Sequence, residues 1–570
     1  MEALLDSIGH IHPVYISVFV AVMRFAAPAL AAIILWRCCK GLLTFKKEPE
    51  VWAWLQISGG KKVPVTHWEN VIGRSKRSDI VIDFPTVSRT HAVLTRYDDG
   101  SWSIADVDSK DGVYVGGKKV NFAALRSNDT ISLGGVQMQL QPMTHKQEKK
   151  MAKLRRRDTD GLESVATLLL LSVFQALTCI GYLMNGSRGY SFEILCGFGG
   201  LMLAQWALLL FYLAIRRPAF ELETLAFFLC SMGMAAIAAV KPEESVKQLI
   251  AIVLGLTVFL LAAWSMRDLE RAKKMRYVAA VTGILLLLVT LLFGKEYYGA
   301  KNWLVLGPLS IQPSELCKVC FVYVGASAMD NLLKKRNIFF FIVYTLTVCA
   351  CLGLMNDFGT AFVFFVAFLI IAYLRSGDVG TVGLALTALG FAGTIGLKLA
   401  PHALKRFSSW RHIWEDPLGG GYQQTRALMC LASGGLFGIG IGEGKMFKIF
   451  AADSDVVIAT ISEEWGLVMA LMVVVAVAVP AVFAIRSAKV SRSSFYAIGA
   501  CTAGGILLVQ TIFNVLGTVD VLPLTGVTMP FVSNGGSSMI CVWGLLAFIK
   551  AADTRQYASF AVRTDRRRIR

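Results

Sequence analysis

Charged residues are scarce in this chain of 570 residues: Asp, Glu, Lys and Arg together make up 17% of it, whereas 55% is hydrophobic. The mean hydropathy is +0.58. Soluble globular domains carry about 25% charged residues, so this composition excludes a chain that is soluble throughout. Most of the residues are expected to lie in a lipid bilayer.

Metal-binding and disulfide patterns are also missing. The 12 cysteines lie mainly inside apolar runs, as Cys349 and Cys351 do, and they show neither paired CxxC motifs nor Cys/His ligand spacing. We interpret them as small buried hydrophobic side chains and predict no metal site from them. The N-terminus lacks the basic region and the small-residue cleavage site of a signal peptide, so a retained anchor is expected.

Positive charge is in excess, with 57 Lys and Arg against 39 Asp and Glu and a formal net charge of +18. These cations fall between apolar runs, on alternate connections. That distribution follows the positive-inside rule, which sets the orientation of multi-spanning membrane proteins. The excess therefore does not imply a nucleic-acid partner.

The apolar runs define a membrane topology. The first, Val14 to Trp36, is followed by a basic flank and predicts an N-terminal anchor over residues 1–48 with the N-terminus outside. About twelve further runs of spanning length follow. They cover residues 164–184, 192–215, 222–240, 246–266, 276–294, 314–333, 337–356, 359–374, 378–398, 457–485, 495–518 and 535–551. Residues 400–456 then form the longest connection on the outer side, where functional residues are expected.

Residues 49–144 have a different character, because short β-type runs alternate there with turn residues. This spacing predicts a small all-β sandwich on the cytoplasmic side. The basic residues 145–163 that follow are interpreted as a linker at the membrane surface.

Three short motifs lie in the β segment: Gly73-Arg74, Val87-Ser88-Arg89-Thr90-His91 and Ser109-Lys110-Asp111-Gly112. They resemble the GR, SxxH and NG motifs of the forkhead-associated (FHA) domain, which lie on loops at one end of a β-sandwich. The resemblance implies a reader of phosphothreonine, with a phosphothreonine-containing protein or Ser/Thr kinase substrate as partner. Arg74, Ser88 and Arg89 supply the donors that a phosphate needs, and His91 is implied to brace the loops.

Asp111 departs from the family pattern, because it stands where the family has the Asn that holds the bound peptide's backbone. A carboxylate accepts hydrogen bonds but does not donate them, and it adds negative charge near the phosphate. A docking module that works without phosphorylation therefore stays open as the alternative.

The membrane segment carries six motif blocks. They are Gly299–Trp303 with Gly307-Pro308 and Ile311–Lys318; Asn356–Ala361; Asp416–Gln423; Gly434–Gly440; Ser454-Asp455 with Glu463-Glu464 and Gly466; and Asn514–Ser538. In this order they resemble the SEDS family (shape, elongation, division and sporulation), which includes the FtsW and RodA peptidoglycan polymerases.

The resemblance implies a ten-helix SEDS core over residues 216–552. An extra transmembrane hairpin over residues 164–215 precedes this core, and a basic cytoplasmic tail over residues 553–570 follows it. The predicted fold is a polytopic α-helical membrane protein, with about three spans beyond the core, and a small cytoplasmic all-β FHA sandwich.

The same resemblance implies an enzyme of the bacterial plasma membrane, a peptidoglycan glycosyltransferase. It would join lipid II units into β-1,4 glycan strands on the outer face, in cell division or elongation. An inverting glycosyl transfer needs a carboxylate to take the acceptor's proton and cations to stabilise the departing pyrophosphate. Asp455 matches the family's essential aspartate and is predicted to be the general base. Arg406, Lys405 and Lys445 are predicted to hold the pyrophosphate.

Three other positions match family motifs and complete the predicted substrate-binding set: Gln423, Glu315 and Lys318. No SxxK, SxN and KTG set is present, so a separate class B penicillin-binding protein is expected as the transpeptidase partner. No organic cofactor is implied, and a divalent cation, Mg²⁺ or Mn²⁺, is left open.

Each role has a structural alternative. Asp455 could only cap the helix that follows it, and Arg406 and Lys405 could be interfacial anchors. Glu315 and Lys318, three residues apart, could form an ion pair inside the bundle.

The function has alternatives as well, namely a flippase that moves lipid II between leaflets and a non-catalytic scaffold. The intramembrane carboxylates Glu463 and Glu464 would suit a transporter as readily as an enzyme, because each must face the bundle or a wet cavity. Asn534, Asn302 and Asn356 replace the family's usual Tyr, Arg and Pro. These departures prevent assignment to the division or the elongation branch.

Overall fold

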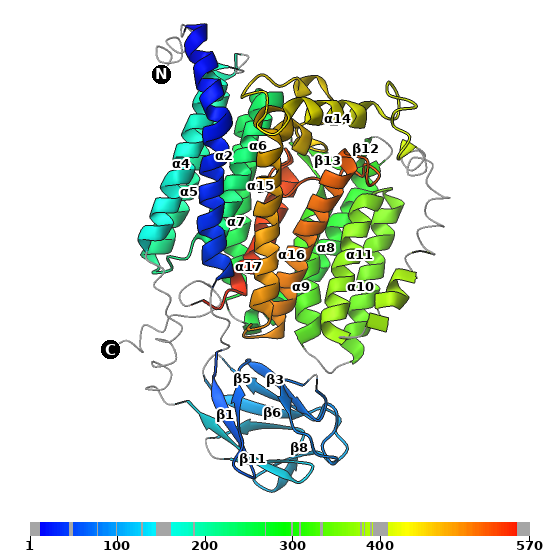
Figure 1. Cartoon of the computed structure of the whole chain (residues 1–570). Coiled ribbons are helices and arrows are strands. Elements are labelled where there is room, and N and C mark those ends of the chain that lie inside the picture. Colours follow the sequence, from blue (N-terminus) through cyan, green and yellow to red (C-terminus); the bar gives the residue numbers. More distant parts are fainter. Residues whose placement is uncertain are drawn as a thin grey trace.

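The structure is a computed structural model of the whole chain. It describes residues 12–44, 50–76, 78–97, 100–126, 129–143, 161–185, 189–267, 269–297, 300–306, 309–330, 335–376, 379–380, 382–387, 390 and 409–555. Within these ranges, long helices lie side by side in a bundle and a β-sandwich lies at one end of it (Figure 1). We call the end of the bundle next to the sandwich the sandwich end, and the opposite end the far end.

The bundle contains apolar helices that agree with the predicted spans. Their bounds are α2 Pro13–Leu43, α4 Gly161–Met184, α5 Ser191–Ala214, α6 Glu221–Val240, α7 Ser245–Ser265, α8 Leu269–Phe293, α9 Pro313–Asp330, α10 Lys335–Leu354, α11 Phe358–Ser376, α15 Val457–Ala488, α16 Ser494–Thr518 and α17 Gly536–Ala551. Among the described residues, eight helices are long and apolar enough to cross a membrane. The polytopic fold is therefore confirmed, while the predicted span 378–398 lies mostly outside the described residues.

Helix α6 lies at the centre of the packing. All residues of an 18-residue apolar stretch in α6 are buried, against 17% of the residues of the corresponding stretch in α8. A helix that is apolar all round needs neighbours on every side, and α6 packs against α2, α4, α5, α7 and α15. Helices α2, α4 and α5, which precede the region of SEDS resemblance, lie together on one side of the bundle (Figure 1).

The sandwich consists of two sheets that enclose a core in which Leu55, Ile104 and Ile131 are fully buried. One sheet has the order β2 (Lys62–Val65), β1 (Ala53–Ile57), β11 (Val136–Pro142), β10 (Thr130–Leu133), β7 (Val113–Val115) and β8 (Lys118–Val120). The other has the order β4 (Ile80–Val81), β3 (Glu69–Gly73), β5 (Ala92–Arg96), β6 (Trp102–Asp106) and β9 (Phe122–Leu125). The all-β prediction is confirmed. Strands β2, β8 and β9 were not expected, because few of their side chains are buried and they lack a strong apolar alternation.

Two further elements at the far end were also not expected. Helix α14 (Tyr422–Gly434) lies within the long connection before α15. A three-stranded sheet of β12 (Lys295–Tyr297), β13 (Ala300–Leu306) and β14 (Leu309–Ile311) joins α8 to α9. These elements cover the far end above the bundle (Figure 1).

The sandwich is docked on the connection between α15 and α16. Arg492 of this connection forms an ion pair with Glu50, with Nε and Oε2 2.7 Å apart. His67 Nδ1 lies 2.6 Å from the Ser491 carbonyl oxygen, and the Trp68 backbone amide donates to the Arg492 carbonyl at 2.6 Å. The Trp68 ring also meets the Tyr496 ring of α16, edge to face, at 6.1 Å. The two parts of the chain are thus held together by buried polar and aromatic contacts.

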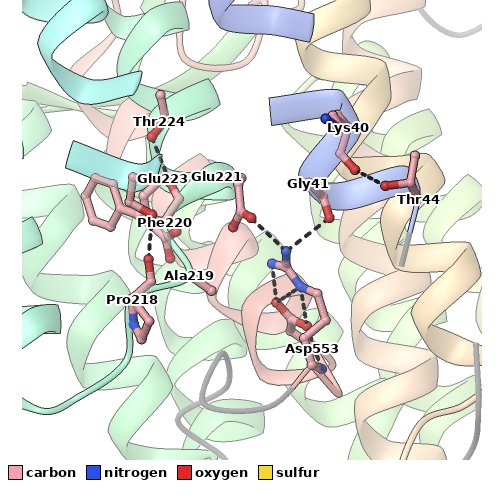
Figure 2. Close-up of polar contacts among 12 residues, drawn as sticks. Lys40, Gly41, Thr44, Pro218, Ala219, Phe220, Glu221, Glu223, Thr224 and Asp553 are labelled. Carbon is pink, nitrogen blue, oxygen red and sulfur yellow. Dashed lines mark hydrogen bonds and ion pairs between the residues drawn. The ribbon is translucent and has the colours of Figure 1, made fainter. Parts of the chain in front are cut away.

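A buried ionic cluster closes the sandwich end. Glu221, Gly41 and Asp553 turn toward one point (Figure 2), where the Arg555 guanidinium contacts both carboxylates and the Gly41 carbonyl. Burial opposes ionisation of Asp553, but the neighbouring Arg555 outweighs burial and lowers the pKa of this carboxyl. The cluster ties the end of α2, the start of α6 and the residues after α17 to one another.

Candidate functional site

Asp455 lies at the far end, directly before α15. Its side chain is half-buried, and its backbone amide donates to the Ala451 carbonyl at 3.0 Å. The N-cap of α15 is Val456, and no side-chain hydrogen bond caps this helix. The structure therefore does not support the alternative in which Asp455 serves as the helix cap.

The backbone around Asp455 is held by the end of α16. Asn514 Nδ2 donates to the carbonyl oxygens of Ser454 (3.3 Å), Asp455 (3.0 Å) and Val527 (3.0 Å). Ser533 Oγ donates to the Ser454 carbonyl at 2.6 Å. Asn514 and Ser533 belong to the C-terminal motif block, but no individual role was predicted for either residue. Their contacts bring that block against Asp455.

Gly526 leaves space beside the Asp455 carboxylate. It has φ +70°, and a Cβ at this position would lie 3.4 Å from Asp455 Oδ2. A left-handed backbone conformation favours glycine. A side chain here would therefore be strained and would also approach the carboxylate.

A second carboxylate, Asp453, is buried next to Asp455 and accepts from two side chains. Its Oδ2 lies 3.2 Å from Lys241 Nζ, and the Lys241 side chain is 42% exposed. Asn534 Nδ2 donates to Asp453 at 2.7 Å and also contacts Glu244. Asn534, which replaces the family's Tyr, thus joins two acids through its side-chain amide.

The glycine-rich segment from Gly434 to Phe450, which we call the far-end loop, is held by two acids of α15. Glu463 accepts from the backbone amides of Lys445 (2.9 Å) and Met446 (3.1 Å), and Glu464 accepts from that of Gly444 (3.3 Å). Both carboxylates are buried, as expected for acids that face the bundle. The Lys445 side chain is exposed. The backbone of this predicted pyrophosphate ligand is therefore fixed while its ammonium group is accessible.

Gln423 contacts the same loop. It lies in the first turn of α14, and its Nε2 donates to the Phe450 carbonyl at 3.0 Å. The structure thus brings Gln423 to the segment that carries Lys445. Lys405 and Arg406 lie outside the described residues.

Glu315 and Lys318 form a buried ion pair at the start of α9. Lys318 Nζ and Glu315 Oε1 are 2.7 Å apart, and the two side chains are 2% and 6% exposed. This geometry agrees with the alternative in which the two residues form an ion pair inside the bundle. A substrate role for either residue stays a prediction.

Asp357 gathers polar residues from the same region. Its Oδ2 accepts from Asn302 Nδ2 at 3.0 Å and from Gln312 Nε2 at 3.3 Å. Asn356, before it, has φ +58°. Proline is restricted to φ near −65°, so the family's Pro could not adopt this conformation, whereas Asn tolerates it.

The predicted phosphate loops meet at one edge of the sandwich. Arg74 N donates to the Ser88 carbonyl at 2.9 Å, and Lys110 N donates to Ser88 Oγ at 3.0 Å. The side chains of Arg74, Arg89 and Asp111 are exposed. The four predicted phosphopeptide residues therefore lie on neighbouring loops. Lys110, which the sequence did not single out, adds a cation beside Asp111.

His91 braces these loops, as the motif resemblance implied. The side chain is fully buried. Its Nδ1 accepts from the Ser88 amide at 3.1 Å, and Nε2 lies 3.1 Å from the Gly112 carbonyl. The ring thus connects the Ser88 loop to the Asp111-Gly112 turn.

Within the described ranges, no group of three or more His, Cys, Asp or Glu residues is arranged to hold a metal ion. Asp453 contacts Lys241 and Asn534, and Asp455 Oδ1 accepts from Ser454 Oγ at 3.2 Å.

Comparison with known proteins identifies both parts of the chain. The family model for FtsW, RodA and SpoVE, described as "Cell cycle protein", matches residues 219–558, and the FHA domain model matches residues 70–134. The FtsW of Nitrosococcus halophilus, named a probable peptidoglycan glycosyltransferase, is 34% identical over 322 residues, which cover 54% of this chain and 82% of the relative. The peptidoglycan glycosyltransferase RodA of Mycobacterium tuberculosis H37Rv is 28% identical over 322 residues, covering 53% of this chain and 69% of the relative.

Matches among solved structures cover the same two parts of the chain. A chain of a peptidoglycan synthase complex that coordinates polymerization and crosslinking is 25% identical, and the match covers 58% of this chain and 96% of that chain with a TM-score of 0.48. An FHA domain from a study of phosphothreonine-dependent interactions is 24% identical over 16% of this chain and 98% of its own, with a TM-score of 0.16. With a family match that spans more than half of its residues, the chain belongs to the FtsW/RodA/SpoVE family and carries an FHA domain.

Proposed function

We propose that this protein is a peptidoglycan glycosyltransferase that polymerises lipid II into β-1,4 glycan strands. Its relatives named above are peptidoglycan glycosyltransferases. The observation that carries the proposal is the placement of Asp455. This half-buried carboxylate has its backbone held by Asn514 and lies beside the space left by Gly526.

In the proposed reaction, the Asp455 carboxylate takes the proton of the acceptor sugar's hydroxyl as that oxygen attacks the anomeric carbon of the donor. The bond from the anomeric carbon to the pyrophosphate oxygen breaks, and the pyrophosphate leaves with the electron pair. General base catalysis of this kind contributes about 10²- to 10⁴-fold in rate. Lys445, with Arg406 and Lys405, stabilises the negative charge on the leaving group.

The place of Lys445 on the far-end loop supports its proposed role in stabilising the pyrophosphate. Glu463 fixes the backbone amides of Lys445 and Met446, while the Lys445 side chain is exposed. Gln423 holds the other end of the loop through the Phe450 carbonyl. A cation on a fixed backbone can meet the pyrophosphate without first ordering the loop.

In the proposed orientation, the sandwich end faces the cytoplasm and the far end faces outward in a bacterial plasma membrane. The sandwich end gathers Arg217, Arg267 and Arg492 from three connections. Burial and the charges of the other two arginines lower the pKa of Arg217 to about 10. Clusters of arginine on one side of a bundle follow the positive-inside rule. Asp455 would then meet lipid II on the outer face.

The FHA domain is proposed to bind a phosphothreonine-containing protein or a Ser/Thr kinase substrate. Arg74, Ser88 and Arg89 lie on neighbouring loops, and both arginine side chains are exposed. A guanidinium and a hydroxyl on braced loops suit a phosphate. A class B penicillin-binding protein is the proposed partner for crosslinking.

The experiment is a reconstitution of the full chain in lipid vesicles that carry lipid II, with and without a class B penicillin-binding protein. Glycan strands resolved by gel are the expected product. Translocation of labelled lipid II without any polymer would support the flippase instead. Neither polymer nor translocation would leave the scaffold as the better account.

A further inference from the structure

Helices α2, α4 and α5 precede the region matched by the FtsW/RodA/SpoVE family model, and we call them the accessory helices. Helix α4 contacts the far-end loop directly. Tyr182 of α4 is fully buried and donates through its hydroxyl to Glu464 Oε2 at 2.6 Å. Glu464 Oε1, in turn, accepts from the Gly444 amide of the loop at 3.3 Å. The carboxylate therefore links α4 to the residue before Lys445.

Asn185, just after α4, makes a second connection. Its Nδ2 donates to the Ile441 carbonyl at 2.9 Å and to Glu443 Oε1 at 2.8 Å. Ile441 is buried against Gly181 of α4, where a Cβ would lie only 2.9 Å from Ile441 Cδ1. The middle of the loop thus packs against the last turn of α4.

Helix α2 also contacts the far-end loop directly. The Phe25 and Phe437 rings lie 5.0 Å apart. A Cβ at Gly440 would lie 2.4 Å from Val20 Cγ1. Both accessory elements therefore pack on the segment between α14 and the Lys445 backbone.

We infer that the accessory helices position the far-end loop, with Tyr182 and Asn185 as positioning residues for Lys445. The loop alone is rich in glycine and has positive φ at Gly435, Gly438, Gly440 and Gly442. Such a backbone loses much conformational entropy when it is fixed. Neutral hydrogen-bond donors from α4 offset that loss and hold the Glu464 carboxylate where it accepts from Gly444.

The same hairpin contains a matched control at the opposite end. Tyr212 of α5 is also fully buried, and its hydroxyl donates to Glu223 Oε1 at 2.8 Å. Tyr182→Phe and Tyr212→Phe therefore remove the same hydroxyl from the same kind of Tyr–Glu pair. Tyr212 lies at the sandwich end, where Glu223 pairs with Lys550 rather than with the loop.

The first test is hydrogen exchange in the full chain, which does not require activity. Loss of one buried hydrogen bond corresponds to about a fivefold change in an opening equilibrium. In Tyr182→Phe, the amides of Gly444, Lys445 and Met446 are expected to exchange at least about fivefold faster. In Tyr212→Phe these amides are expected to keep the wild-type rate. Asn185→Ala provides a second variant should Tyr182→Phe fold poorly, and the same acceleration is expected.

The second test rests on the proposed function and compares lipid II polymerisation in the two variants. A looser loop is expected to raise KM for lipid II about fivefold in Tyr182→Phe, whereas a loss of folded protein alone would lower only kcat. Tyr212→Phe is expected to keep the wild-type KM. Unchanged exchange at Gly444 to Met446, or equal acceleration in both variants, would overturn the inference. Loop-specific exchange in a protein that makes no glycan would support the positioning role and refute the proposed function.

Discussion

Two groups of acidic side chains at opposite ends of the bundle, those of the sandwich-end cluster and those of α15, are satisfied differently. At the sandwich end, cations satisfy them: Arg555 contacts Glu221 and Asp553, and Lys550 contacts Glu223. At the far end, the α15 acids Glu463 and Glu464 accept from loop amides and a tyrosine hydroxyl. An ion pair locks helices to one another, whereas a carboxylate bound by neutral donors orders a loop and keeps nearby cations available.

We expect this difference to separate stability from chemistry between the sandwich-end cluster and the α15 acids with their loop. Substitutions at the sandwich end are expected to lower stability. Substitutions near Asp455 are expected to lower activity and to leave the fold intact.

The largest effect is expected for Asp455→Asn. Loss of the general base is predicted to reduce glycan polymerisation by about 10³-fold, while the melting temperature stays near the wild-type value. Asp520→Asn is the control, because Asp520 is a carboxylate at the same end with φ +58°, which Asn also tolerates. Polymerisation by Asp455→Asn at the level of Asp520→Asn would refute the general-base role.

Arg555→Ala is predicted to lower the free energy of unfolding by about 3–5 kcal/mol, because it leaves the buried Asp553 and the partly buried Glu221 without their cation. Thermal and denaturant unfolding in detergent measure this loss. Lys445→Ala, an exposed change at the far end, is predicted to stay within about 0.5 kcal/mol of the wild type. Equal stability of the two variants would contradict the division between the ends.

The Asp553 carboxyl gives this cluster a pH dependence. Its folded pKa is lowered, so its stabilising contribution is complete above the unfolded value of about 3.9 and is lost as the pH falls through the folded pKa. Unfolding curves across this acid range should show the loss in the wild type. Arg555→Ala should show less of it, and an identical acid dependence in both proteins would contradict the assignment.

Lys318→Met is predicted to cost about 3 kcal/mol of unfolding free energy, because Glu315 is left buried and unpaired. The double variant Glu315→Gln/Lys318→Met is predicted to recover most of that stability. Unfolding measurements on both variants test the ion pair. A stable double variant that no longer polymerises lipid II would instead assign the pair to the substrate.

The smallest effects are expected at the FHA loops. Arg74→Ala is predicted to weaken binding of a phosphothreonine peptide to the full chain by about tenfold, because a charge-assisted hydrogen bond is lost. Asp111→Asn is predicted to tighten it by about threefold, since an amide can donate and carries no negative charge. Calorimetric titration measures both, with the unphosphorylated peptide as control. Equal binding of both peptides by the wild type would favour docking without phosphorylation.

Local patterns predicted much of the fold. The runs 192–215 and 222–240 differ by at most one residue at each end from α5 and α6, because long apolar segments in lipid have few other conformations. The sheet β12–β14 and helix α14 were missed, since both are short and lie in polar connections. Strand β8 was missed because its residues are largely exposed.

The candidate site was predictable where a motif or a charge pattern carried it. The motif resemblance singled out Asp455 and Gln423, and Lys445 was predicted as a cation of the long outer connection; the structure places all three at the far end. The pairing of Tyr182 with Glu464 joins residues 282 positions apart, and no local pattern encodes such a contact. The role of Asn514 was hidden for a related reason, because its partners are backbone carbonyl oxygens, which leave no signature in side-chain sequence.

The most direct measurement of the central claim is photocrosslinking of the full chain in vesicles with a lipid II analogue that carries a photoreactive group next to its pyrophosphate. Mapping of the labelled peptides should place the crosslinks in the far-end loop, around Asp455, or in the turn between α16 and α17. Excess unlabelled lipid II should suppress them. Crosslinks confined to the sandwich end would contradict the account.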